Sequence, residues 1–161
     1  DFQDQEYSET KKVMEQFDID AKISAVEPGE CRGINGLILN VDLSYDEINT
    51  ADFAGIIFIG GTGTEQFLKD GSVHALAKSF VDANKVVGAI CWAPAMLALA
   101  GLLRGKKATV WSGAKDDLII GQAIYTAESV TVDGKIITAD GPDSATAFGE
   151  AIGKMITSPN Q

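Results

Sequence analysis

The chain has 161 residues, of which 45% are hydrophobic and 22% charged, and its formal net charge is −10 at pH 7. This length suits a single domain over residues 1–161 with its own hydrophobic core, and it is short for two domains. The acidic charge disfavours nucleic acid or anionic lipid as a partner, and no apolar run approaches the length of a membrane span.

The first third of the chain predicts a helix followed by three strands. Apolar residues at helical spacing indicate a helix over residues 5–17, and alternation over residues 21–26 indicates a strand. A glycine-containing stretch leads into a second apolar run at residues 36–41. Residues 53–59 form a near-continuous apolar run that ends in a pair of glycines, which is typical of a strand buried on both faces of a parallel sheet.

The rest of the chain continues with helices and strands in alternation. The expected elements are a helix over residues 64–84, a strand over 86–90, a helix over 94–103, a strand over 108–112, strands over 129–132 and 135–138, and a helix over 144–156. The Asp133-Gly134 pair between two of these strands predicts a hairpin. Alternation of this kind favours a doubly wound α/β sheet.

Cys91 stands between a short apolar strand and a helix that has Pro94 near its start. Small residues on both sides, Ala89 and Ala93, allow the tight turn of a nucleophile elbow. At such a turn, we expect the helix start to favour the thiolate and the free backbone N–H groups to hold an oxyanion. The local pattern fits a buried structural cysteine equally well.

A second strand ends in the glycine loop of residues 60–63. In a parallel sheet this loop would lie on the same edge as Cys91, where ligands bind. It is not a phosphate loop, because no Gly-Lys-Ser or Gly-Lys-Thr follows it. The glycines fit plain turn residues as well.

Several segments, taken together, resemble the ThiJ/PfpI family, which belongs to the class I glutamine-amidotransferase-like superfamily and includes the parkinsonism-associated deglycase and the archaeal intracellular proteinases. The segments are Phe2-Gln-Asp-Gln-Glu6, Ile59-Gly-Gly-Thr-Gly63, Gly88-Ala-Ile-Cys-Trp-Ala-Pro94, Gly101-Leu-Leu-Arg-Gly-Lys-Lys-Ala-Thr109 and Ile137-Thr-Ala-Asp-Gly-Pro142. The resemblance covers essentially the whole chain. It implies a flavodoxin-like, mostly parallel sheet sandwiched by helices, with a small C-terminal hairpin. It also implies that the first, central strand, expected immediately before Asp1, is missing from this sequence.

The resemblance also assigns the site. Cys91 matches the elbow cysteine, Glu6 the acidic residue that hydrogen-bonds to it, and Gly61 with the backbone N–H of Trp92 the oxyanion hole. Because two negative charges close together are unfavourable, we expect Glu6 to stay protonated and to donate to the thiolate. Without the resemblance, Glu6 is interpreted as a solvated acidic residue.

Gly60 and Trp111 complete the expected binding residues, and the two tryptophans, Trp92 and Trp111, are expected to leave a small apolar pocket. Peptidase-like members place a histidine directly after the cysteine, where this chain has Trp92, and other members supply one near the position of Trp111. The single histidine, His74, lies in a helical pattern and is interpreted as a surface or partly packed residue. The lack of a Cys–His pair disfavours a peptidase.

We therefore predict a cysteine-dependent enzyme, a hydrolase or lyase that acts on small reactive carbonyls or their adducts, as a glyoxalase or deglycase in stress protection. One alternative is a thiol redox sensor or chaperone without turnover, which needs only an accessible reactive cysteine. A second alternative is an intracellular cysteine peptidase or amidase. No cofactor is expected.

Cys31 and Arg32 lie in a stretch whose glycines suggest a projecting turn or hairpin. In the family this region contributes a dimer contact, so the resemblance implies a homodimer or larger assembly in which Arg32 reaches a partner's carbonyls or carboxylates. An ordinary solvated arginine is the alternative. The two cysteines, without a CxxC motif or a Cys/His cluster, indicate no metal site and a reducing, cytoplasmic compartment.

Overall fold

The computed structural model describes residues 1–158, and a four-stranded sheet runs through their centre. Its strands, in spatial order, are β5 (Gly55–Phe58), β6 (Val86–Ile90), β10 (Ile136–Ala139) and β9 (Val130–Asp133). β6 is parallel to both β5 and β10, whereas β9 is antiparallel to β10. The predicted hairpin is confirmed, and its turn contains Gly134 at a φ of +60°.

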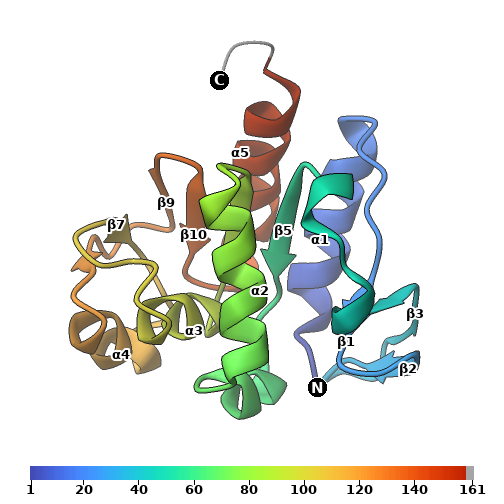
Figure 1. Cartoon of the computed structure of the whole chain (residues 1–161), viewed down its shortest axis with the longest axis horizontal. Coiled ribbons are helices and arrows are strands. Elements are labelled where there is room, and N and C mark those ends of the chain that lie inside the picture. The colour runs from blue at the N-terminus through green and yellow to red at the C-terminus, as the bar shows by residue number, and fades with distance from the viewer. Residues whose placement is uncertain (159–161) are drawn as a thin grey trace.

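Helices cover both faces of this sheet (Figure 1). α1 (Asp4–Gln16) and α5 (Ala145–Thr157) pack in one apolar core, and α2 (Gly71–Asp82) and α3 (Ala93–Leu99) pack in another, with α4 (Lys115–Ile120) beside α3. These three layers confirm the predicted flavodoxin-like α/β class. Within residues 1–158, no helix is both long and apolar enough to cross a membrane.

Three two-stranded pairings and five 3-10 helices complete the described elements. β1 (Ser24–Ala25) is parallel to β4 (Leu43–Ser44), β2 (Gly29–Arg32) forms an antiparallel hairpin with β3 (Ile38–Val41), and β7 (Lys107–Ala108) is parallel to β8 (Ile124–Tyr125). The 3-10 helices are η1 (Tyr45–Glu47), η2 (Thr50–Asp52), η3 (Thr62–Phe67), η4 (Ser112–Ala114) and η5 (Pro142–Ser144).

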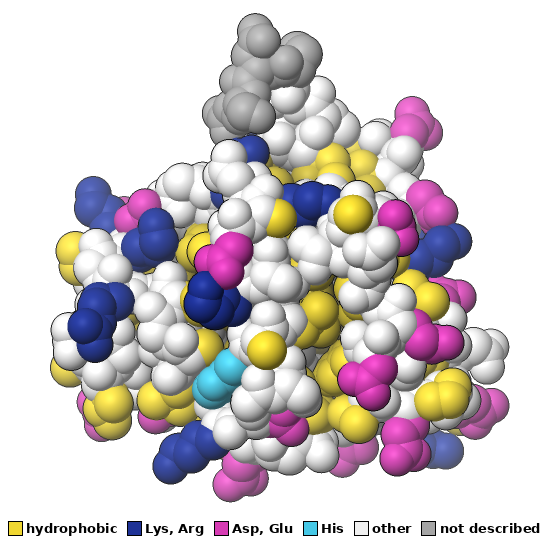
Figure 2. Space-filling model, in the orientation of Figure 1, with side chains coloured by type: hydrophobic (Ala, Val, Ile, Leu, Met, Phe, Trp, Pro, Cys, Tyr) yellow, Lys and Arg dark blue, Asp and Glu magenta, His cyan; other side chains and the backbone are white. Residues whose placement is uncertain are grey.

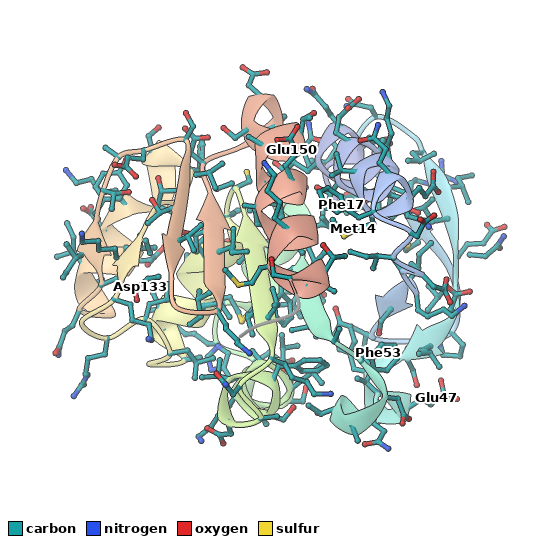
Figure 3. All side chains as sticks on the ribbon, turned by 90° about the horizontal axis from the view of Figure 1, so that it is seen from above. Met14, Phe17, Glu47, Phe53, Asp133 and Glu150 are labelled. Carbon is teal, nitrogen blue, oxygen red and sulfur yellow. The ribbon has the colours of Figure 1, made fainter. Side chains whose placement is uncertain are left out.

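The contact between α1 and α5 fixes the helix that carries Glu6. A Cβ at Gly153 would lie 2.5 Å from Phe17 Cδ2, and one at Gly149 would lie 3.0 Å from Val13 Cβ. The helices can approach this closely because glycine has no side chain. Phe17 and Met14 lie on the side of α1 that faces α5 and the sheet (Figure 3).

A groove separates β5 from β1. β5 pairs with β6 alone and β1 with β4 alone among the described residues, and the cavity between them has a volume of about 830 Å³. Its lining includes Ile23, Ile57 and Ile59, and apolar side chains are visible in the hollow beside α2 (Figure 2). β5 has the near-continuous apolar sequence of a strand buried on both faces, although its residues are only half-buried.

The helix predicted over residues 64–84 is wrong as a single element. The structure has η3 first, and α2 begins only at Gly71. The Asp70 side chain accepts hydrogen bonds from the backbone N–H groups of Ser72 and Val73. An aspartate in this position starts a new helix rather than continuing an old one, because it satisfies N–H groups that have no helical partner.

The region after Cys91 also differs from the prediction. α3 ends at Leu99, before Gly101, which adopts a φ of +77°, a conformation that terminates helices. The strand predicted over residues 108–112 shrinks to the two residues of β7, and α4 and β8 were not predicted. Two-residue strands and a six-residue helix carry too little periodicity to be recognised from sequence.

Candidate functional site

Cys91 occupies a strained turn between β6 and α3. Its φ is +62°, a left-handed conformation that residues with a Cβ rarely adopt. The Cys91 N–H donates to the carbonyl of Ala139 at 2.9 Å, and the Cys91 carbonyl accepts from Trp111 N–H at 2.8 Å. Such a backbone costs on the order of 1–3 kcal/mol and persists only where its surroundings hold it. The sharp strand-to-helix turn predicted at Cys91 is therefore present.

The carboxyl group of Glu6 lies against this turn. Glu6 is in the first turn of α1 and is fully buried. Its Oε2 accepts a hydrogen bond from the backbone N–H of Gly60 at 3.0 Å. Its Oε1 is buried without a hydrogen-bond partner of regular geometry among residues 1–158, and the carboxyl contacts the Cys91 thiol closely enough to shift both pKa values.

Gly60 is the point where the two side chains meet. A Cβ at this position would lie 2.6 Å from Cys91 Cβ and 2.9 Å from Glu6 Oε2. Both distances are too short for real atoms, so only glycine fits between the cysteine and the glutamate. The glycine loop therefore has a steric role in the site beyond that of a turn.

Burial raises the pKa of Glu6 to about 7, from an ordinary value of 4.5. Removal from water disfavours the carboxylate, and the hydrogen bonds from the Cys91 thiol and from Gly60 N–H only partly offset this effect. The shift has the direction expected from the sequence, since it keeps the carboxyl protonated up to neutral pH.

Burial also raises the pKa of Cys91, to about 12 from an ordinary value of 9.0. The charge of Glu6 and the hydrogen bond with it act in the same direction, whereas the N–H groups of Trp92 and Gly61 lower the pKa. The Trp92 N–H at the start of α3 thus acts in the expected direction, but burial and the carboxyl outweigh it, so the net shift of the thiol pKa is upward.

The two groups titrate as a coupled pair. Both are protonated below about pH 7, and between about pH 7 and 12 the pair holds one proton and one negative charge. The N–H groups of Trp92 and Gly61 point to the sulfur and stabilise that charge when it lies on the thiolate. A thiol, a buried carboxyl and two N–H donors are thus gathered at one point.

Two tryptophans form an apolar wall near Cys91. The ring centroids of Trp92 and Trp111 are 5.9 Å apart, with a tilt of 60° between the planes. The Trp111 ring lies on the backbone of Gly113, where any Cβ would overlap it. Trp92 is half-buried, but Trp111 is 46% exposed, so this wall is accessible from solvent.

The structure leaves Arg32 and His74 outside this cluster of contacts. Arg32 is exposed on β2, and its carbonyl accepts the N–H of Phe2 at 3.3 Å. His74 is half-buried in α2, where its Nε2 is 2.9 Å from the carbonyl oxygen of Leu68. His74 is therefore a partly packed residue of α2, as the sequence suggested.

Sequence reasoning missed Gln3 and the backbone of Ala139. Gln3 caps α1: its side chain accepts the N–H of Glu6 at 3.0 Å. The spacing Gln-x-x-Glu before a helix was a usable signal for this residue, because a cap bonds to the N–H three positions later. Nothing in the sequence near Ala139 indicated that its carbonyl would hold Cys91 N–H, since β10 and β6 meet only in the fold.

A model of the DJ-1/PfpI family matches residues 1–155. The chain belongs to the DJ-1/PfpI family. An uncharacterized protein of Methanocaldococcus jannaschii is 38% identical over 164 residues, which span all of this chain and 80% of that protein. A deglycase of Pyrococcus horikoshii is 30% identical over 134 residues, 83% of this chain and 81% of the deglycase.

The solved structures agree with this membership of the DJ-1/PfpI family. A ThiJ/PfpI domain protein from Brachyspira murdochii is similar with a TM-score of 0.95 and 33% identity. The similarity covers 97% of this chain and 90% of that one. The resemblance noted in the sequence is confirmed.

Proposed function

We propose that this DJ-1/PfpI protein uses Cys91 to convert small reactive carbonyl compounds, above all 2-oxoaldehydes such as methylglyoxal, or their adducts. The observation that carries the proposal is the contact between the buried Glu6 carboxyl and the Cys91 thiol, a pair that holds one proton just above neutral pH. Such a pair supplies a nucleophile and a proton carrier at the same place. The relative named as a deglycase supports this class of chemistry.

In the proposed reaction, the sulfur of Cys91 adds to the aldehyde carbon. A C–S bond forms, the C=O π bond opens, and the oxygen takes the pair's proton to give a hemithioacetal. The Glu6 carboxylate then removes the hydrogen from that carbon and returns it to the neighbouring ketone carbon, while the hydroxyl proton passes to the former ketone oxygen, which leaves a lactoyl thioester. Water cleaves the C–S bond, releases lactate and restores the thiol, so no external oxidant or reductant is consumed.

The N–H groups of Gly61 and Trp92 have two roles in this scheme. They stabilise the thiolate before attack. After attack they can donate to the negative oxygen of the adduct instead. Trp92 and Trp111 offer an apolar surface to a short substrate. A large, charged substrate would gain less binding energy from this apolar surface than a three-carbon aldehyde would.

The test is the formation of lactate from methylglyoxal. The intact protein is expected to form lactate faster than an equal concentration of a free small thiol, with the rate proportional to the protein concentration. Lactate formation no faster than with the free thiol would refute turnover. Oxidation of Cys91 by mild peroxide under the same conditions would then favour the redox alternative.

A peptidase reading has less support, because His74 bonds to a carbonyl within its own helical region and no histidine reaches Cys91 among residues 1–158. Proton transfer to an amine leaving group would fall to Glu6 alone.

We also propose a cytoplasmic setting, in which the two free cysteines, Cys31 and Cys91, stay reduced.

We propose further that the β2–β3 hairpin contributes to a homodimer. Arg32 is exposed beside Ile34 and Ile38, which are 47% and 46% exposed and give the hairpin an apolar surface around a cation. Arg32→Glu is expected to shift a dimer towards monomer at low micromolar concentration, because it adds like charge to an already acidic protein. Sedimentation velocity measures the shift, and an unchanged profile would rule this contact out.

A further inference from the structure

We propose that Gln3 is a positioning residue that sets the Glu6 carboxyl against the Cys91 thiol, a role that rests on the proposed function of this pair. No hydrogen bond of Gln3 within residues 1–158 reaches the sulfur. Gln3 acts through the backbone of the first turn of α1, which determines where the Glu6 side chain can reach. The inference comes from a closed set of hydrogen bonds among Gln3, Glu6 and Gly60.

Three bonds close this set. The Gln3 side-chain oxygen accepts the Glu6 N–H at 3.0 Å, the Gln3 N–H donates to the Gly60 carbonyl at 2.8 Å, and the Gly60 N–H donates to Glu6 Oε2 at 3.0 Å. Every partner is thereby held by the other two. Gly60 also packs so closely against Cys91 that a Cβ at Gly60 would overlap Cys91 Cβ. These hydrogen bonds therefore connect the start of α1 directly to the turn at Cys91.

The arrangement is half of a capping box. In a complete box, the glutamate at the third helical position turns back and accepts the N–H of the capping residue. Here the Gly60 carbonyl takes the Gln3 N–H instead, so the Glu6 carboxyl is free to extend to Gly60 N–H and to Cys91. The Glu6 carboxyl, which would accept the Gln3 N–H in a complete capping box, therefore extends towards Gly60 and Cys91 instead.

Charged neighbours do not compete for Glu6. Asp4, the other acidic residue of this turn, uses both carboxyl oxygens on the hairpin, accepting the N–H groups of Asn35 and Leu37 at 2.8 and 2.9 Å. The titratable group that faces Glu6 is Cys91, and Gly60 N–H is the other group that shifts its pKa. A change in Gln3 therefore acts on Glu6 through position and burial alone.

The experiment follows the Glu6 carboxyl by NMR in protein labelled with ¹³C at glutamate Cδ, with Glu6→Gln identifying its signal. In Gln3→Ala the first turn loses its cap, water reaches the carboxyl, and the titration midpoint is expected to fall by about one pH unit. Gln3→Asn keeps an amide oxygen and is expected to restore most of the shift. Methylglyoxal turnover is expected to fall about tenfold in kcat, with KM unchanged.

Asp70→Ala is the matched control, because Asp70 caps α2 in the same way and lies outside the proposed site. It should lose similar thermal stability and leave the Glu6 midpoint unchanged. An unchanged midpoint in Gln3→Ala, with a loss of stability like that of Asp70→Ala, would overturn the proposal. If Gln3→Ala does not fold, Gln3→Met keeps the chain length without the amide oxygen and takes its place. Absence of turnover in the wild type would refute the proposed function but leave the titration result decisive for Gln3.

Discussion

Cys91→Ala is expected to reduce lactate formation from methylglyoxal by at least about a thousandfold, to the rate of the solution reaction. The variant has no sulfur to form the C–S bond on which every later step depends. Alanine also has a Cβ and a small volume, so the same backbone hydrogen bonds to Ala139 and Trp111 can hold the strained turn at a φ of +62°. The fold should therefore survive while turnover disappears.

Cys31→Ala is the control for this result. Cys31 is half-buried in β2, opposite Leu39, and burial raises its pKa. Among the residues that the structure describes, no buried carboxyl lies against its sulfur, so its loss should leave turnover within about twofold of the wild type. Equal rates in Cys91→Ala and the wild type would refute the role of Cys91, and a loss confined to Cys31→Ala would move the chemistry to the hairpin.

Glu6→Gln is expected to lower turnover by about 10²–10⁴-fold, because the amide cannot carry the proton between the two substrate carbons. The same variant should change how stability depends on pH. The pKa of Glu6 is about 7 in the folded protein against 4.5 in an unfolded chain, so folding retains the proton over this range. The stabilisation is complete below about pH 4.5 and is lost as pH rises through 7.

The wild type is therefore expected to lose a few kcal/mol of unfolding free energy between about pH 5 and pH 8 through this group, and Glu6→Gln to lose less. Urea unfolding at both pH values measures the difference. Glu15→Gln changes an exposed glutamate of the same helix and should keep the wild-type dependence. If Glu6→Gln and the wild type lose the same stability, Glu6 is not the buried acid described here.

The local sequence was sufficient to predict those elements that depend only on residues close together in the chain. The Asp-Gly turn at residues 133–134 and its flanking apolar strands predicted the β9–β10 hairpin correctly. The buried run that ends at Cys91, with Pro94 in the next helix, predicted the elbow. Turns and fully buried strands depend on residues that are adjacent in the chain, so their sequence patterns can be recognised without knowledge of the fold.

The ordered motifs also identified the family, and with it the partnership of Glu6 and Cys91. Nothing in the residues around Glu6 marked it as buried, and on its own pattern it belonged to a solvated helix start. The resemblance supplied the assignment, and the geometry supplied the reason: Gly60 lies between the two side chains and leaves no room for a Cβ.

Tertiary structure alone decided the net shift of the Cys91 thiol pKa. The sequence led to a lowered thiol pKa from a helix start, but the fold places the sulfur in a buried position against a carboxyl and raises it. It also divided the helix predicted over residues 64–84. A pKa depends on the water excluded and the charges gathered around a group, and segments far apart in the chain supply both only once they have packed together.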